Sequence, residues 1–295
     1  MNWLMQNAIA TMAGPQFLLL FVVVAAVTLL ACWWWVRQSD PTANLPALPV
    51  PTSPDPYEIA YLRGGENEVL RLAIFRLIQR GCLRVTEESK WWGTKEQRIE
   101  RTGKAADQLL ILEREVLGGI AAHTVQEVFQ DAALVERVKA HCRTYEHQLM
   151  DRQLLVWPDY QAAAYQVGLV GTLAIVGIGG YKLLIAWGKG HSNVGFLIFM
   201  GIAALSILWR ICSPRLTAKG KEYLHDLELA FEPWKDRASE VTQHQLLLMA
   251  GVFGMTVLSG TTYDYLREIF SKGSANGGGC GGGGCGGCGG CGGCG

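Results

Sequence analysis

The sequence has no excess of charge of either sign and no familiar catalytic motif. Its 26 basic and 26 acidic residues cancel over 295 positions, so no global attraction to nucleic acid or to anionic lipid is expected. It contains no G-x-S-x-G, Walker A, H-E-x-x-H or G-x-G-x-x-G pattern. We therefore expect a protein that is not an enzyme, has no catalytic residues and does not bind nucleic acid.

Charge is also nearly missing from three long hydrophobic stretches. Residues 15–36 carry no charged side chain, and residues 162–187 carry only Lys182. A third stretch, residues 194–212, follows after a short polar turn. Because about 20 apolar residues cross the hydrocarbon core of a bilayer as a helix, we predict three transmembrane helices.

The first stretch is interpreted as an uncleaved span rather than a secretory signal. Residues 1–16 lack the Lys or Arg of a signal peptide, and three tryptophans (33–35) occupy the place of a small-residue cleavage site. These tryptophans and Arg37 are typical of an interfacial anchor. The glycines of the other two stretches are predicted to let their helices approach closely: Gly168, Gly171, Gly177, Gly179 and Gly180 against Gly195 and Gly201.

The flanking basic residues predict the orientation. Arg37 follows the first span and Arg152 precedes the second. The second and third spans form a hairpin, and Lys182 and Lys189 lie near its turn, on the opposite side of the membrane. Four more follow the third span: Arg210, Arg215, Lys219 and Lys221. The positive-inside rule then places the N-terminus outside and both soluble segments in the cytoplasm.

A small α+β domain is predicted after a proline-rich linker at 37–56. Within 57–161, apolar residues at helical spacing predict a helix over 66–79, which Gly81 ends. Strands are expected at 82–86 and 97–101. This order resembles a winged helix, yet no dense Lys/Arg stripe favours DNA binding, so we expect a domain that binds a protein partner.

Further helices are expected after the strands at 82–86 and 97–101. Within the same domain they cover 105–117, a segment capped by Thr124, and 132–155. Residues 213–272 are interpreted as cytoplasmic helices. Within them, 246–262 is only 17 residues long, so a helix packed on the cytoplasmic domain or at the interface is favoured over a fourth span.

The last segment, 273–295, is predicted to be a flexible, disordered tail that carries closely spaced thiols. Residues 277–295 contain only glycine and five cysteines: Cys280, Cys285, Cys288, Cys291 and Cys294. Thiolates at C-x-x-C spacing bind zinc, copper(I) or iron–sulfur clusters. Because only glycine separates them, no tetrahedral geometry is preorganised, which favours a labile array for zinc or copper over a structural site.

Three other interpretations of the tail stay open. The exposed thiols suit a cysteine-modifying enzyme, and they also suit redox sensing. A low-complexity tail without selected chemistry is the third alternative. The four remaining cysteines, Cys32, Cys82, Cys142 and Cys212, are scattered and are interpreted as ordinary buried residues.

The order of these features resembles an uncharacterised bacterial membrane-protein family. The motif residues are Tyr61, Leu62, Arg63, Gly64 and Gly65, with Arg80–Leu83, Leu216–Gly220 and the cysteine tail in the same order. The resemblance covers nearly the whole chain. It implies a multi-pass protein of the bacterial inner membrane, but it carries no established activity.

Together these features predict a mainly α membrane protein with three transmembrane helices, a small winged-helix-like cytoplasmic domain and a disordered Gly/Cys tail. We expect a non-enzymatic protein whose tail binds soft metal ions or is modified at cysteine. The alternative is a membrane-anchored interaction or assembly module in which the tail is incidental. The bilayer, a protein that binds 57–161 and a cysteine-modifying enzyme are the expected partners.

Overall fold

The computed structural model describes residues 14–46, 48–51, 53–89, 95–104, 109–120, 123–188, 195–235, 237 and 241–274. The chain is mainly helical and divides into two compact units. Unit 1 comprises the residues up to Pro46 and Leu155–Lys219, and unit 2 comprises Ala47–Leu154 and the residues from Gly220 onward.

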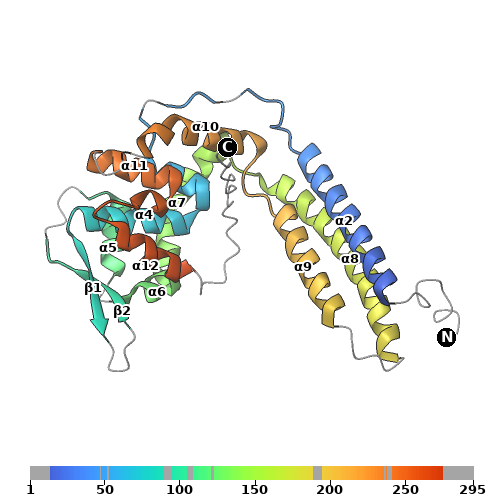
Figure 1. Cartoon of the computed structure of the whole chain (residues 1–295). Coiled ribbons are helices and arrows are strands. Elements are labelled where there is room, and N and C mark those ends of the chain that lie inside the picture. The colour runs from blue at the N-terminus through green and yellow to red at the C-terminus, as the bar shows by residue number, and fades with distance from the viewer. Residues whose placement is uncertain are drawn as a thin grey trace, which may run out of the picture. The chain divides into compact units, whose positions relative to one another are not determined.

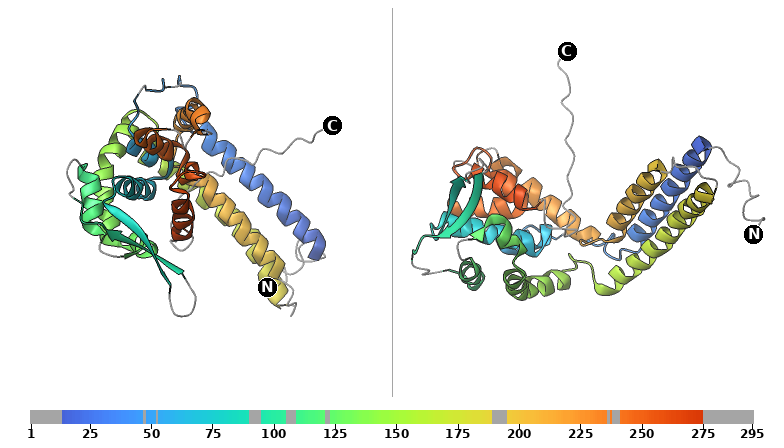
Figure 2. Two further views of the ribbon diagram at one scale, coloured as in Figure 1. Left: turned by 60° about the vertical axis from the view of Figure 1, so that its left-hand side comes forward. Right: turned by 90° about the horizontal axis from the view of Figure 1, so that it is seen from below.

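Unit 1 is a bundle of three apolar helices, α2 (Gly14–Gln38), α8 (Pro158–Gly188) and α9 (Gly195–Cys212), which run side by side in Figures 1 and 2. All three are long and apolar enough to cross a membrane. They confirm the three hydrophobic spans that the sequence predicts. α8 begins four residues before its predicted start, at Pro158, because proline is well suited to the first turn of a helix.

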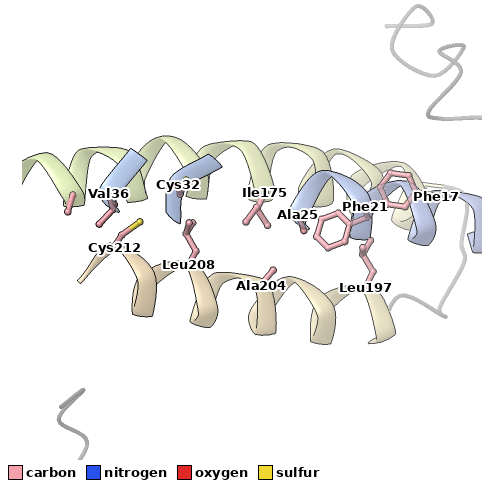
Figure 3. Packing of buried hydrophobic residues seen from close by; sticks show 11 residues of the cluster. Phe17, Phe21, Ala25, Cys32, Val36, Ile175, Leu197, Ala204, Leu208 and Cys212 are labelled. Atoms are coloured by element: carbon pink, nitrogen blue, oxygen red, sulfur yellow. The ribbon is translucent and has the colours of Figure 1, made fainter. Parts of the chain in front are cut away.

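The bundle is held together by a narrow apolar seam. Figure 3 shows side chains of α2, α8 and α9 gathered between the helices; the buried cluster comprises Phe17, Phe21, Ala25, Cys32, Val36, Ala164, Ile175, Leu197, Ala204, Leu208 and Cys212. The outward faces are also apolar, and Leu30, Leu173 and Phe199 are each more than 60% exposed. A surface this apolar is compatible with a lipid environment.

The glycines of α8 make contacts that differ from the prediction. A methyl group added at Gly168, Gly171 or Gly179 would contact side chains of α2 or α9. At Gly177 and Gly180 it would meet open space, as it would at both glycines of α9. The predicted close approach of α8 and α9 is therefore confirmed at Gly168 and Gly171, which lie against α9 side chains, but the glycines of α9 take no part in it. Three α8 glycines instead make room for larger side chains of the two other helices.

One end of the bundle carries the polar connections of unit 1. The hydroxyl of Tyr160 donates to the carbonyl oxygen of Val36 at 2.5 Å. The backbone N–H of Ala218 donates to Oδ2 of Asp40 at 2.6 Å, and that of Lys219 to Oγ1 of Thr42 at 3.3 Å. These side chains satisfy backbone donors at the start of helix α10, which would otherwise lack partners.

Unit 2 is built around one almost fully buried helix, α4 (Glu66–Gln79). Its other helices are α3 (Pro56–Gly64), α5 (Ile111–Gly119), α6 (Val125–Gln130), α7 (Ala132–Asp151), α10 (Ala218–Lys235, from Gly220 onward), α11 (Gln243–Phe253), a 3-10 turn (Met255–Leu258) and α12 (Asp264–Ser274). The bounds of α4 are those predicted. Gly81 ends it with φ +71°, and the N–H groups of Gly81 and Cys82 donate to the carbonyls of Ile78 and Leu77.

A small antiparallel sheet follows α4. Strand β1 (Leu83–Ser89) pairs with β2 (Lys95–Arg101), and Val85 lies opposite Ile99. The predicted hairpin is thus present, with longer strands than expected. A short third strand, β3 (His123–Thr124), pairs with β2 after α5. Helix α5 begins later than predicted, and residues 105–108 of that prediction lie outside the described part.

The ambiguous stretch 246–262 does not form one helix. It begins inside α11, which ends at Phe253 because Gly254 has φ +79° and ψ −172°, a conformation nearly restricted to glycine. α11 is 11 residues long, about half of what a bilayer requires. Gly251 lies against the backbone of Pro56 in α3, so α11 packs within unit 2.

Candidate functional site

The cysteines of the predicted metal site, Cys280–Cys294, lie outside the described residues. The predicted motif Tyr61–Gly65 is described in full, at the junction of α3 and α4. Tyr61 and Leu62 are buried in the core of unit 2. Gly65 joins the helices with φ +74° and ψ −155°, and its N–H donates to the carbonyl of Tyr61 at 2.9 Å. The final glycine is therefore needed for a backbone turn that other residues rarely adopt.

Arg63 of this motif belongs to a charged cluster whose central residue is Glu68. The carboxylate of Glu68 forms ion pairs with both Arg63 and Arg71. The guanidinium of Arg71 also lies 5.6 Å from the ring centre of Phe129. Burial lowers the pKa of Arg63, whereas the charge of Glu68 raises it. On the other side of Arg63, Gly254 leaves no room for a side chain.

These contacts give the motif a structural role. The turn at Gly65, the Arg63–Glu68 ion pair and the end of α11 at Gly254 meet at one place, so the motif joins α3, α4 and α11. Breaking a mostly buried ion pair on one side leaves a charge without a partner, which costs about 3–5 kcal/mol. Arg63 is held inside this cluster, with its side chain about 20% exposed.

A second polar cluster surrounds the start of α3 and was not predicted. The carboxylate of Asp55 accepts a hydrogen bond from the N–H of Tyr57 at 2.9 Å and so caps α3. The hydroxyl of Tyr145 donates a hydrogen bond to the same carboxylate. Burial and this carboxylate raise the pKa of Tyr145. Arg152 donates to Glu58 at 2.8 Å. Burial raises the pKa of Glu58, Arg152 lowers it, and Asp55 raises it.

A buried tyrosine–carboxylate pair lies beneath this cluster. The hydroxyl of Tyr57 donates to Oε1 of Glu113 at 2.8 Å, and Glu113 is only 1% exposed. The second oxygen of Glu113 accepts from the N–H of Leu110 at 3.2 Å. Burial, followed by the charge of Glu113, raises the pKa of Tyr57. The pair links α3 to α5 and satisfies a carboxylate that would otherwise be buried without a partner.

The surface of unit 2 has an aromatic groove along α10 and α11. One hollow of about 270 Å³ is lined by Ser53, Pro54, Phe231, Trp234, His244, Gln245, Leu248 and Met249. A neighbouring hollow of about 460 Å³ shares Trp234 and Gln245. Trp234 is 44% exposed and follows Pro233, which lies in the last turn of α10. Large exposed aromatic side chains in a groove are typical of binding surfaces.

Within the described ranges, no three His, Cys, Asp or Glu side chains come close enough to hold a metal ion. The four cysteines described there, Cys32, Cys82, Cys142 and Cys212, are buried and not in disulfides. No known protein family, curated protein or solved structure matches the chain. The resemblance to an uncharacterised bacterial membrane-protein family therefore stays a prediction.

Proposed function

We propose that this chain is a non-enzymatic integral membrane protein whose Gly/Cys tail binds soft metal ions or is modified at cysteine. The observation that carries the proposal is the distribution of thiols. Four cysteines are buried in the described part of the chain, and the other five follow one another in a segment that otherwise contains only glycine. We therefore expect the tail thiols to react with external reagents before the four buried ones, because buried thiols react slowly.

The tail chemistry fits a labile site. Copper(I) and zinc are bound by thiolates, which lose their protons when the metal binds. Glycine spacers let two to four sulfurs converge on one ion, at the cost of ordering a flexible backbone. The proposed array therefore exchanges its metal readily. The same open flanks suit recognition by a cysteine-modifying enzyme, which is the second form of the proposal.

We place the protein in the bacterial inner membrane with unit 2 and the tail in the cytoplasm. Support comes from the basic residues at the end of the bundle where the Tyr160 hydroxyl donates to the carbonyl of Val36. Arg37 and Arg210 lie in the last turns of α2 and α9, and Arg215 follows α9. The positive-inside rule assigns such an end to the cytoplasm. Among the described residues, Lys182 is the basic residue that lies near the opposite end of the bundle, with its Nζ 5.0 Å from the ring centre of Phe17.

A membrane-anchored interaction module is the alternative, and the groove beside Trp234 favours it. In this version unit 2, winged-helix-like through α3, α4 and the β1–β2 hairpin, binds a protein partner. The tail then has no role of its own. Trp234→Ala would weaken partner binding in this case and leave metal binding unchanged.

The two functions separate when the thiols are removed but the tail is kept. The test compares the full chain with a variant in which all five tail cysteines are replaced by serine, which keeps the length and the glycines. Both are titrated without oxygen with copper(I) against a colorimetric chelator, and in parallel with zinc. We expect tight binding to the full chain and its loss in the variant. Equal binding by both proteins would refute metal binding by the tail.

The modified form has its own test. Protein purified from its native host is weighed intact and again after reduction. A mass that exceeds the encoded chain, with the excess localised to residues 277–295, supports modification. A mass equal to the encoded chain with five free tail thiols contradicts it. Labelling intact cells with a membrane-impermeant thiol reagent checks the placement, since a cytoplasmic tail stays unlabelled until the membrane is opened.

A further inference from the structure

Two cysteines that are 180 positions apart meet inside the helix bundle of unit 1. Cys32 of α2 is 7% exposed and Cys212, the last residue of α9, is 0% exposed. Their side chains form a hydrogen bond with each other. Figure 3 shows both at one end of the seam, close to Val36 and Leu208. The scattered cysteines of the sequence therefore include one spatial pair.

Helix α8 locates both sulfur atoms independently of that bond. The Cys32 thiol donates to the carbonyl oxygen of Val167 at 3.9 Å. A methyl group added at the next residue, Gly168, would lie 3.4 Å from Sγ of Cys212, and one added at Gly171 would lie 3.1 Å from Sγ of Cys32. Residues three apart are neighbours on one helix face, so both sulfurs lie on the same small patch of α8.

The buried cluster that contains the two thiols is hydrophobic. Since Cys32 donates its single proton to Val167, Cys212 is the donor between the two thiols. Leu208, Val36 and the glycines of α8 surround the pair. Two thiolates around copper(I) would leave a net negative charge in this apolar seam, which is unfavourable. Zinc would need further ligands, and within the described residues no three His, Cys, Asp or Glu side chains come close enough to hold a metal ion. A disulfide carries no charge, so the surroundings favour it over a metal complex.

We propose that Cys32 and Cys212 form a reversible disulfide that joins α2 covalently to α9. The oxidant is a small neutral hydroperoxide, which can reach the pair because Cys32 precedes the interfacial tryptophans and Cys212 ends its helix. The hydroperoxide converts one thiol to a sulfenic acid and leaves as an alcohol or as water. The second thiol attacks the sulfenic sulfur, the S–S bond forms, the S–O bond breaks and water leaves. Two thiols thus lose two electrons and two protons.

Burial sets the speed of this reaction. The thiolate is the attacking species, and an apolar seam disfavours it. The pair is therefore oxidised more slowly than the tail thiols and, once formed, the bond is reduced slowly as well. It responds to sustained rather than brief oxidation. The proposal does not depend on the function of the tail.

The test oxidises the full chain in detergent micelles with hydrogen peroxide. Remaining thiols are then blocked with N-ethylmaleimide, and peptides are identified by mass spectrometry. We expect a linked peptide pair that contains Cys32 and Cys212 and disappears on reduction. It is absent from Cys32→Ser and Cys212→Ser and persists in the matched control Cys82→Ser, because Cys82 is buried in unit 2.

A second measurement does not depend on recovering membrane peptides. A protease site is inserted between α8 and α9 in a variant whose five tail cysteines are serine, so that cleavage leaves Cys32 and Cys212 on different fragments. After oxidation the fragments stay together on a non-reducing gel and separate with dithiothreitol. The proposal is overturned if the fragments separate without reductant, or if the link survives in Cys212→Ser. It is also overturned if Cys32 and Cys212 are still free when oxidation is continued long after the tail thiols of the full chain have been consumed.

Discussion

Gly254→Ala tests whether α11 ends where unit 2 requires it to. With φ +79° and ψ −172°, Gly254 lies in a backbone region nearly restricted to glycine, and an alanine there costs about 1–3 kcal/mol. The added methyl group would also collide with the guanidinium of Arg63. Moving Arg63 disturbs its ion pair with Glu68, and overpacking of this kind costs a further 1–3 kcal/mol or so. We expect a total loss of about 2–6 kcal/mol in the unfolding free energy of unit 2.

This loss is measured by urea denaturation, with pulse proteolysis used to determine how much of unit 2 is unfolded at each urea concentration. With a slope of about 2 kcal/mol per molar urea, the midpoint falls by roughly 1–3 M. Two control variants divide the effect. Gly260→Ala has φ +73° but open space around it, so it reports backbone strain without the collision. Gly118→Ala lies in open space within α5 and is expected to be neutral or slightly stabilising. A Gly254→Ala midpoint no lower than that of Gly260→Ala would refute the role assigned to Arg63.

Three further predictions concern other contacts. Gly171→Ala places a methyl group 3.1 Å from Cys32 and Leu208 and lowers the thermal stability of the bundle in detergent, whereas Gly177→Ala, which meets open space, leaves it unchanged. Tyr57→Phe leaves an oxygen of the buried Glu113 without its donor and costs about 1–3 kcal/mol in urea unfolding; a loss below 0.5 kcal/mol or so contradicts this. Because the folded-state pKa of Glu58 is raised, the folded state holds the proton more tightly. The stability of the wild type relative to Glu58→Gln should therefore fall as pH rises from below the ordinary carboxyl pKa to above the raised one. The opposite slope, measured by urea unfolding at several pH values, contradicts the assignment.

Most of the fold could be predicted from the length of the hydrophobic stretches and from the local spacing of apolar residues. The three spans follow from long apolar runs with at most one charged residue each, and α4 and the β1–β2 hairpin follow from spacing and from Gly81. Some missed features also had local signals. Asp55 followed by Pro56 is a helix-start pattern, and Thr242 with Gln245 is a capping box. These two signals identify the starts of α3 and α11.

Contacts between distant residues left no signal in a single sequence. Tyr57 and Glu113 are 56 positions apart, and nothing in their local patterns distinguishes them from surface residues. Cys32 and Cys212 are farther apart still, and the pairing depends on the register of three helices. The break at Gly254 was missed because a glycine within an apolar run is also common in a membrane span. The backbone angles of Gly254 and the position of Arg63 show why glycine is needed there, and neither can be read from the sequence.

Native mass spectrometry of the full chain and of the variant with five tail serines tests the central proposal most directly. Protein from the native host is weighed as isolated and after equilibration with copper(I) or zinc. We predict metal adducts or a covalent mass increase in the full chain, and neither in the variant. If both proteins show the encoded mass and the same metal content, the tail does not carry the function proposed for it.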